Sequence, residues 1–392
     1  MPFYYHLGEL PHKRHTQFRK PDGTLYREEV VGLEGFSGLE SILYHTWQPT
    51  QLLHAEKLGE TKVEYADFGA LRHRHFKTLA VQPGGDPVSG RRILMGNNDV
   101  TLGVCRPTES MPYYYRNGQS YELYFVHSGE GTLHTILGKL DFHAGDYIMI
   151  PFGITWRMEL RGTEHRFLVI ESPSMIQTPK RYRNQYGQML EHAPFCERDF
   201  RVPTDLETHD EQGEFEVRVK VRDQLTRHIL DHHPFDVVGW DGYLYPWIFN
   251  IADFEPITGR VHQPPPVHQT FEGNNFVVCS FVPRLFDYHP LSIPAPYNHA
   301  NVNSDEVLYY VDGNFMSRRG IDVASFTLHP AGLPHGPHPG TVEASIGAQR
   351  TNELAVMLDT FHPLNITAEA VACEDPNYAY SWVTQPMPTP AG

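Results

Sequence analysis

Short strand signals follow one another closely between residues 90 and 150. Turns are expected at Ser128-Gly129, Gly138 and Ala144-Gly145, where glycine interrupts the apolar runs. Intervals this short leave no room for helices, so an antiparallel sandwich or barrel is favoured over alternating strands and helices. The fold class is therefore predicted to be all-β. The predicted strands cover residues 92–95, 101–104, 121–126, 131–137, 139–142 and 146–150.

A second strand-rich block runs from residue 237 to about residue 360, and fewer strand signals lie between the two blocks. The charged stretch 211–224 lies in that interval and marks the predicted junction. A chain of 392 residues is long enough for two or three domains. We predict an N-terminal domain over residues 1–230, a C-terminal domain over 231–372, and an extended Pro-rich tail over 373–392.

The charge balance excludes some classes of partner. The chain has 32 basic and 47 acidic residues, a formal charge of -15, and no run rich in lysine or arginine. Nucleic acid and anionic membranes are therefore not expected as partners, because both need a basic surface. No signal peptide or bilayer-spanning stretch is recognised, which predicts a cytoplasmic protein. Reduced thiols, rather than disulfides or a zinc site, are expected at the widely spaced Cys105, Cys196, Cys279 and Cys373.

Two stretches place histidines next to predicted strands. His299 is followed seven positions later by Glu306, at the start of an apolar run that ends in the turn Asp312-Gly313. His335 lies in a Pro- and Gly-rich bend after the predicted strand 323–328. Two imidazoles and one carboxylate form a ligand set that leaves coordination positions open, as in non-haem Fe(II) oxygen chemistry. A single histidine usually has a structural role, but this pairing favours a metal site.

The first block repeats the pattern of the second without its histidines. Tyr115 and Trp156 stand at the histidine positions, and Glu122 stands at the carboxylate position. The two blocks resemble the double-stranded β-helix of the cupin superfamily, whose motifs read H-x-H-x-x-x-x-E and G-D-x-x-x-x-P-x-G-x-x-H. The resemblance implies a bicupin of two jelly-roll barrels over roughly residues 90–360, in which only the second barrel binds metal. Asn301 replaces a further histidine of many cupins, which opens a coordination position for substrate or O2.

The resemblance is sharpest to the homogentisate 1,2-dioxygenase family. Matching its motifs residue by residue implies that His299, Glu306 and His335 bind Fe(II). The segments that carry the resemblance are residues 18–26, 236–247, 296–306 and 328–337.

The same resemblance implies roles for further residues. His262 falls at the position of the family's acid/base histidine, and His268 is a competitor for that role. Phe315 falls at a substrate-contacting position of the family. His329 and His338 flank the third ligand, His335, and are therefore candidates to orient substrate or O2. The two histidines have an alternative role, in which they support the third ligand through hydrogen bonds.

Three departures from the family pattern bear on the substrate. Ala300 replaces the usual arginine after the first ligand, and Phe315 replaces a substrate-contacting tyrosine. One extra residue follows His299, which leaves Asp305 as a rival to Glu306. The way in which the substrate's carboxylate is held is therefore open, and the reaction class is a firmer expectation than the substrate.

The resemblance implies a ring-cleaving dioxygenase of aromatic amino-acid catabolism. Homogentisate and O2 would be the substrates and maleylacetoacetate the product, in the degradation of tyrosine and phenylalanine. One alternative is a dioxygenase for another hydroquinone or gentisate-type acid. Another is a non-oxidative metal-dependent cupin, either an isomerase or hydrolase or a binding protein, because the fold does not determine the function. Assembly into a homo-oligomer is left open.

Overall fold

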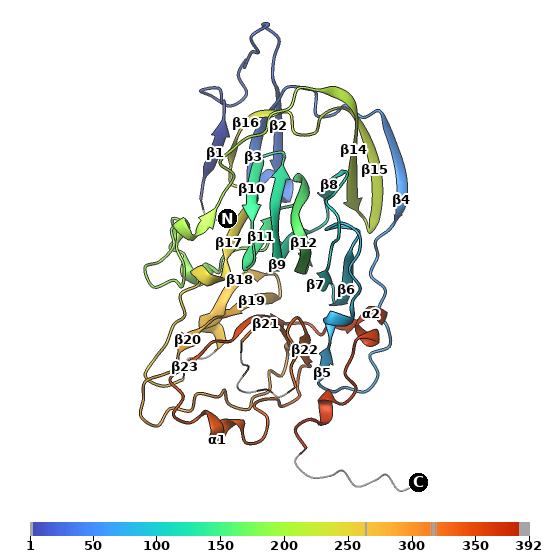
Figure 1. Cartoon of the computed structure of the whole chain (residues 1–392). Coiled ribbons are helices and arrows are strands. Elements are labelled where there is room, and N and C mark those ends of the chain that lie inside the picture. Colours follow the sequence, from blue (N-terminus) through green and yellow to red (C-terminus); the bar gives the residue numbers. More distant parts are fainter. Residues whose placement is uncertain (1–2, 263–264, 314, 316–317, 319, 384–392) are drawn as a thin grey trace. The chain divides into compact units, whose positions relative to one another are not determined.

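The structure is a computed structural model that describes residues 3–262, 265–313, 315, 318 and 320–383 (Figure 1). The chain forms two compact units, each built from segments that are separated in the sequence. Unit 1 comprises the chain up to Glu64 together with Pro83–Arg92 and Leu102–Asp253. Unit 2 comprises Tyr65–Gln82, Ile93–Thr101 and the chain from Phe254 onward.

Unit 1 contains two sheets. The smaller has the order β1-β16-β3-β2 and the larger the order β13-β17-β11-β9-β12-β8-β14-β15-β4, with β10 paired to β9. All of these pairs are antiparallel except β14 with β8. The strands of the smaller sheet are β1 (Tyr5–Gly8), β2 (Arg27–Gly32), β3 (Glu40–His45) and β16 (Val237–Gly242). Those of the larger sheet are β4 (His54–Glu60), β8 (Tyr114–Asn117), β9 (Tyr121–Thr135), β10 (Gly138–Phe142), β11 (Asp146–Ile150), β12 (Thr155–Ser172), β13 (Phe200–Arg201), β14 (Gln212–Val221), β15 (Gln224–His232) and β17 (Trp247–Asn250).

Unit 2 is centred on an antiparallel sheet with the order β18-β19-β24-β21-β22-β5. Its strands are β5 (Arg74–Phe76), β18 (Gln269–Gly273), β19 (Phe276–Phe281), β21 (Asp305–Asp312), β22 (Phe326–His329) and β24 (Leu354–Thr360). The strands of the chain not yet named, whichever unit they belong to, are β6 (Arg91–Gly96), β7 (Thr101–Cys105), β20 (Arg284–Leu285), β23 (Arg350–Thr351) and β25 (Asn365–Ile366).

Helices are short in the described part of the chain. The α-helices are α1 (Thr341–Ser345) and α2 (Ala368–Ala372), and the 3-10 turns are Glu34–Phe36, Thr78–Ala80, Lys180–Tyr182, Glu197–Asp199, Ile251–Asp253, Pro265–His268 and Tyr378–Tyr380. None of the helices in the described ranges has the length and apolar character needed to cross a membrane.

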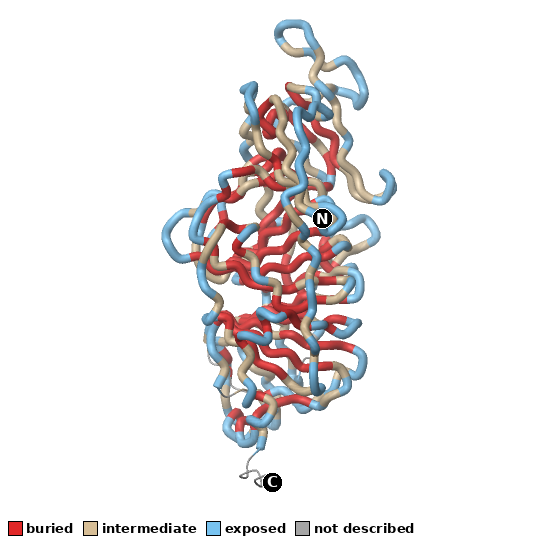
Figure 2. The backbone as a smooth tube through the Cα atoms, turned by 90° about the vertical axis from the view of Figure 1, so that its right-hand side faces the viewer, coloured by how far each residue is buried: buried red, intermediate tan, exposed pale blue. Residues whose placement is uncertain are grey.

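The predicted all-β class is confirmed, because strands make up the sheets of both units and the described helices are short. Burial is strongest in central strands such as β11, in which every residue is buried, whereas β4 at the edge of its sheet is mostly exposed. Figure 2 shows the buried residues in red. The predicted turn at Ser128-Gly129 is wrong, because β9 continues through it to Thr135. Gly129 has a φ of 98° and bends the strand without ending it.

The grouping of the chain differs from the predicted domain limits. The limit at residue 230 falls inside β15, which pairs with β14 within unit 1. The charged stretch 211–224 suggested a junction because one face of this hairpin is polar, and a two-residue turn at Arg222-Asp223 joins its strands. Residues 373–383, assigned to the tail, instead pack onto unit 2, with Tyr378 buried. The rest of that predicted tail lies outside the described residues.

A buried ion cluster occupies the core of unit 1 where the cupin resemblance predicted a barrel without metal. Tyr115 and Trp156 are cross-strand partners with no exposed surface, and their ring centroids lie 5.4 Å apart. Glu122 accepts a hydrogen bond of 2.6 Å from Arg91 Nη1, and the same nitrogen lies 2.6 Å from Glu171. The guanidinium of Arg91 therefore supplies the positive charge that a buried carboxylate needs.

We expect Arg91→Leu to destabilise the protein by roughly 3–5 kcal/mol, the usual cost of removing one partner from a buried ion pair. The substitution leaves the buried Glu122 without its cation. Chemical denaturation followed by tryptophan fluorescence measures the loss. Arg92→Leu is the matched control, because the side chain of Arg92 is exposed and bonds only to nearby backbone carbonyls. Equal stabilities for the two variants would contradict the role of Arg91.

Candidate metal centre

His299 and His335 lie on two loops of unit 2 that pair with each other. The backbone N–H of each donates to the carbonyl of the other, and both distances are 2.8 Å. Directly opposite residues in such a pair present their side chains on the same side. Their ring centroids are accordingly only 4.2 Å apart. Gly336 permits this approach, because a Cβ there would lie 2.8 Å from Asn298 Cα.

Glu306 completes the group from the start of β21. Its Oε2 lies 3.4 Å from His299 Nε2, and its Oε1 lies 3.3 Å from His335 Nε2. The ligand atoms of the three residues all lie within 4.8 Å of one another. No other group of three or more histidine, cysteine or carboxylate side chains comes this close within the described ranges, unit 1 included.

Asp305, the rival carboxylate, faces away from the imidazoles. Its two oxygens accept hydrogen bonds from the backbone N–H groups of Ala331 and Leu364, both at 2.7 Å. Successive residues of a strand point to opposite faces of the sheet, so only one of the two carboxylates can face the histidines. In this structure that carboxylate is Glu306.

The hydrogen bonds of the two histidines fit a bound cation. His299 Nδ1 lies 3.1 Å from the carbonyl of Tyr297, and His335 Nδ1 lies 3.3 Å from the carbonyl of Leu333. A carbonyl only accepts, so each Nδ1 carries the proton and each neutral Nε2 presents a lone pair. Both lone pairs face a carboxylate, which also only accepts. The buried His335 Nε2 has no hydrogen-bond partner. A metal ion between the three groups resolves this mismatch.

The carboxylate of Glu306 is buried but ionised. Burial by itself raises the pKa of Glu306, but the surrounding rings of His299, His329 and His335 outweigh it and hold that pKa well below its usual range. The nearby carboxylate of Glu306 is also the main reason why the pKa of His299 is raised. The centre therefore carries a fixed negative charge that a cation can neutralise.

His329 supports Glu306 from behind. It is the cross-strand partner of Glu306 on β22, and its Nδ1 lies 2.7 Å from Glu306 Oε1. The ring has no exposed surface, and burial lowers the pKa of His329 to about 3. His329 is thus a neutral donor to the carboxylate, and it does not line the pocket beside the centre.

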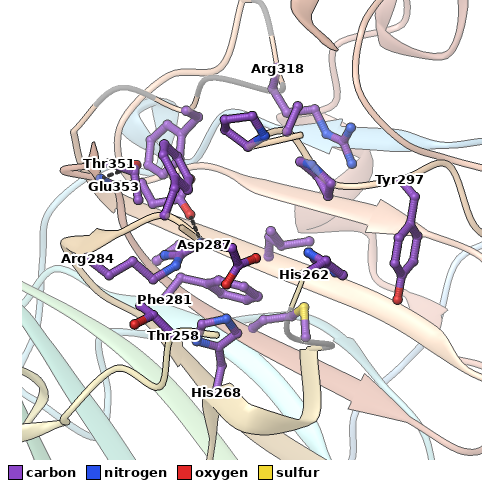
Figure 3. A pocket seen from close by; sticks show the side chains of 18 of the residues that line it. Thr258, His262, His268, Phe281, Arg284, Asp287, Tyr297, Arg318, Thr351 and Glu353 are labelled. Carbon is purple, nitrogen blue, oxygen red and sulfur yellow. Dashed lines mark hydrogen bonds and ion pairs between the residues drawn. The ribbon is translucent and has the colours of Figure 1, made fainter. Parts of the chain in front are cut away.

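A pocket of unit 2 opens onto the centre (Figure 3). His299, Glu306 and Arg318 line it together with a largely apolar wall. In Figure 3 the labelled Arg318 lies at the top of the view and His268 at the bottom. The apolar and aromatic lining residues are Ile257, Phe281, Leu308, Tyr310, Phe315, Ala355 and Met357.

Of the other residues singled out in the sequence, His262, His268 and Phe315 line this pocket. His262 is exposed, and its ring centroid lies 4.8 Å from that of Tyr297. His268 is buried against Phe281, and burial lowers its pKa to about 3. The two candidates for the acid/base role therefore sit in different surroundings.

His338 lies outside the pocket lining. Its Nε2 is 2.7 Å from Ser381 Oγ, and its ring stacks on Trp382 with a centroid distance of 4.3 Å. These contacts match the supporting role that was open for His338. The side chain is not among the residues that line the pocket.

The structure adds Arg318 and Tyr297 to the candidate residues. The sequence offered a signal for Arg318, because this arginine follows the strand of Glu306 by a short loop. Arg318 Nη1 donates to the carbonyl of Gly336, and its Nε is buried without a hydrogen-bond partner. Tyr297 precedes His299 by two residues and also lines the pocket.

Comparisons with known proteins identify relatives of this chain. A family model described as "Homogentisate 1,2-dioxygenase N-terminal" matches residues 54–251. A presumed dioxygenase of Saccharolobus solfataricus is 42% identical over 391 residues, which cover 98% of this chain and 100% of that protein. Among solved structures, a cupin 2 conserved barrel domain protein from Leptotrichia buccalis aligns with a TM-score of 0.33 and 9% identity, over 77% of this chain and 99% of its own.

Named homogentisate 1,2-dioxygenases match at lower identity. The enzyme of Pseudomonas putida is 25% identical, over 97% of this chain and 92% of its own length. The enzyme of Bradyrhizobium diazoefficiens is also 25% identical, and the match covers 70% of this chain but 64% of that enzyme. The family model covers half of the chain and the Saccharolobus protein nearly all of it. The chain belongs to the homogentisate 1,2-dioxygenase family.

Proposed function

We propose that the protein is an Fe(II)-dependent dioxygenase that opens the ring of homogentisate. The observation that carries the proposal is the group of His299, Glu306 and His335 at a pocket with an aromatic wall and a cationic side chain. Two hydroxyls in para positions and a carboxymethyl arm define homogentisate. Both atoms of O2 enter the product, and the ring bond that breaks joins the arm-bearing carbon to the adjacent hydroxyl-bearing carbon. The product is maleylacetoacetate.

The ligand set favours iron over other metals. Two imidazoles and one carboxylate on one side of an ion, with the other positions open, are characteristic of non-haem Fe(II) oxygenases. When bound, Fe(II) supplies the one-electron chemistry that lets triplet O2 react with a closed-shell ring, which zinc cannot do. The task of the chain is to hold its three ligands in place, which the paired loops and β21 do.

Arg318 is the side chain best placed to bind the carboxymethyl arm. A guanidinium stays charged at all physiological pH values and recognises carboxylates through paired N–H groups. Arg318 lines the pocket beside His299, and its Nε has no internal partner. Arg284 also lines the pocket, but its Nη2 already donates to Glu353 at 2.8 Å. Arg318 would thereby bind the substrate's carboxylate, which neither Ala300 nor Phe315 can do with its side chain.

The aromatic wall holds the ring of the substrate. Phe315 packs edge-on against Tyr310, with a centroid distance of 4.5 Å, and both line the pocket. Phenylalanine cannot hydrogen-bond a substrate hydroxyl, so Phe315 orients the ring by packing alone. A substrate ring packed on this surface would exclude water from it, which would strengthen the charge interactions at Arg318 and Glu306.

His262 moves the phenolic proton in this proposal. An imidazole exchanges protons efficiently near neutral pH, and His262 lies in the pocket wall without being a metal ligand. His268 is the weaker candidate, because burial lowers its pKa to about 3 and leaves it a poor base at neutral pH. Tyr297 packs against His262 and limits the orientations of its ring.

Loss of metal should distinguish Glu306 from Asp305. Protein loaded anaerobically is expected to hold about one iron per chain. We expect Glu306→Gln to lose it, because an amide cannot replace the carboxylate charge, and Asp305→Asn to retain it. Plasma mass spectrometry of desalted protein measures the content. Iron retained by Glu306→Gln would contradict the ligand set, and two irons per chain would show that unit 1 also binds metal.

Arg318→Met should separate recognition of the carboxylate from the chemistry. A hydrogen bond to a charged group contributes about 1.5–3 kcal/mol, so kcat/KM for homogentisate is expected to fall roughly 10- to 150-fold. Turnover of its methyl ester, which lacks the charge, should change little. Oxygen consumption measures both, and Arg284→Met is the matched control. Equal losses with acid and ester would remove Arg318 from this role. If the wild type turned over gentisate but not homogentisate, the proposed substrate would be wrong, while the proposed ring-cleaving reaction would stand.

His262→Asn should retain iron and lose turnover by roughly 10²–10⁴-fold, the usual contribution of a general acid–base group. His268→Asn is expected to lower the melting temperature, because that histidine is buried, while the folded fraction stays active. Melting scans beside oxygen-electrode traces separate the two outcomes. A His262→Asn variant with normal turnover would contradict the assignment.

A further inference from the structure

The segment from Glu374 to Val383, assigned from the sequence to a tail, packs onto unit 2 beside the candidate metal centre. Glu374 forms a β-bridge with Phe76, and its carboxylate pairs with Arg72 at 2.9 Å and Arg74 at 2.7 Å. Both the carboxylate and the guanidinium of Arg74 are buried. Breaking such a pair is costly, so the start of the segment is held firmly to β5.

Tyr378 connects this segment to Glu306 through His329. The Tyr378 hydroxyl lies 3.2 Å from His329 Nε2, and His329 Nδ1 lies 2.7 Å from Glu306 Oε1. The ionised carboxylate of Glu306 only accepts hydrogen bonds, so His329 Nδ1 must carry the proton. Neutral His329 then presents a lone pair at Nε2, and the phenol donates to it. Burial raises the pKa of Tyr378, which keeps the hydroxyl protonated and able to donate.

The end of the segment contacts the loop that carries His335. Trp382 Nε1 donates to the carbonyl of Gly336 at 3.1 Å, one residue after His335. The ring of Trp382 lies parallel to that of His338, with an interplanar angle of 12°. Ser381 Oγ lies 2.7 Å from His338 Nε2. Two of the three candidate ligands are therefore braced from one short segment, Glu306 through His329 and His335 through its own loop.

We propose that residues 374–382 form a positioning element that sets the affinity and the ligand geometry of the metal centre. Tyr378 acts through His329, because it fixes the tautomer that orients the Glu306 carboxylate. Trp382 and Ser381 act on the His335 loop. The inference rests on the proposed metal centre and adds the residues that hold two of its ligands. Groups that hydrogen-bond to ligands in this way typically change metal affinity 10- to 100-fold when they are removed.

Tyr378→Phe tests the positioning role with the smallest change. It removes the hydroxyl and keeps the ring, which packs 5.3 Å from His75 and 5.2 Å from Trp382 between centroids. Titration of the metal-free protein with Co²⁺ in a calorimeter is expected to show binding about 10- to 100-fold weaker than in the wild type. The visible absorption bands of the Co²⁺ protein should shift, because they report ligand geometry. A simple loss of stability would not move these bands.

Tyr380→Phe is the matched control. Tyr380 lies in the same 3-10 turn as Tyr378, but it is 53% exposed, so its affinity for Co²⁺ is expected to equal that of the wild type. In a His329→Ala background, Tyr378→Phe should cause no further loss of affinity, since the phenol acts through His329. If the double variant does not fold, the two single tyrosine variants decide.

The outcomes separate this inference from the proposed function. Equal Co²⁺ affinity and spectra for the wild type and Tyr378→Phe would overturn the positioning role alone. Additive losses in the His329→Ala background would overturn the route through His329. A wild-type protein that binds no Co²⁺ would overturn the metal centre itself, and with it the proposed function.

Discussion

A buried carboxylate among imidazole rings is the constraint on which the site depends. Glu306 has little exposed surface, yet three histidine rings hold its pKa well below the usual range, so it remains charged. A charge buried in a protein interior needs hydrogen bonds and a counter-charge close by. His329 supplies a donor, while His299 and His335 present lone pairs that cannot satisfy an acceptor. A cation between these groups would satisfy all three of them, and the strands and loops of unit 2 hold the groups around that position.

Each of the two units buries a carboxylate that needs a counter-charge, but the two carboxylates have different surroundings. In unit 1 the carboxylate at the corresponding motif position, Glu122, is paired with the guanidinium of Arg91 from the same chain. The histidine positions of that motif hold Tyr115 and Trp156, whose rings fill the space instead of binding a metal. Both units thus keep a buried carboxylate, and within the described residues only that of unit 2 lies in a group of possible metal ligands.

Departures from the family pattern are concentrated at the substrate rather than at the metal. By the resemblance, Ala300 and Phe315 stand where the family pattern has two polar side chains, whereas the paired histidines and Glu306 match that pattern. Arg318 offers a positive charge from a different position, on the loop after β21. The identity of 25% to named homogentisate 1,2-dioxygenases is compatible with such a change in the pocket. The reaction class therefore rests on stronger ground than the choice among para-diphenol acids.

The sequence by itself determined the features that depend on local pattern. Short apolar runs and glycine turns indicated the all-β class, and motif spacing singled out His299, Glu306 and His335, which the structure brings within 4.8 Å. It left Asp305 open, because adjacent carboxylates differ only in the face of the strand to which they point. The tertiary structure alone showed that Asp305 caps two backbone N–H groups, that Arg91 compensates Glu122, and that Tyr378 reaches His329. These contacts join residues far apart in the chain, and no local periodicity encodes them.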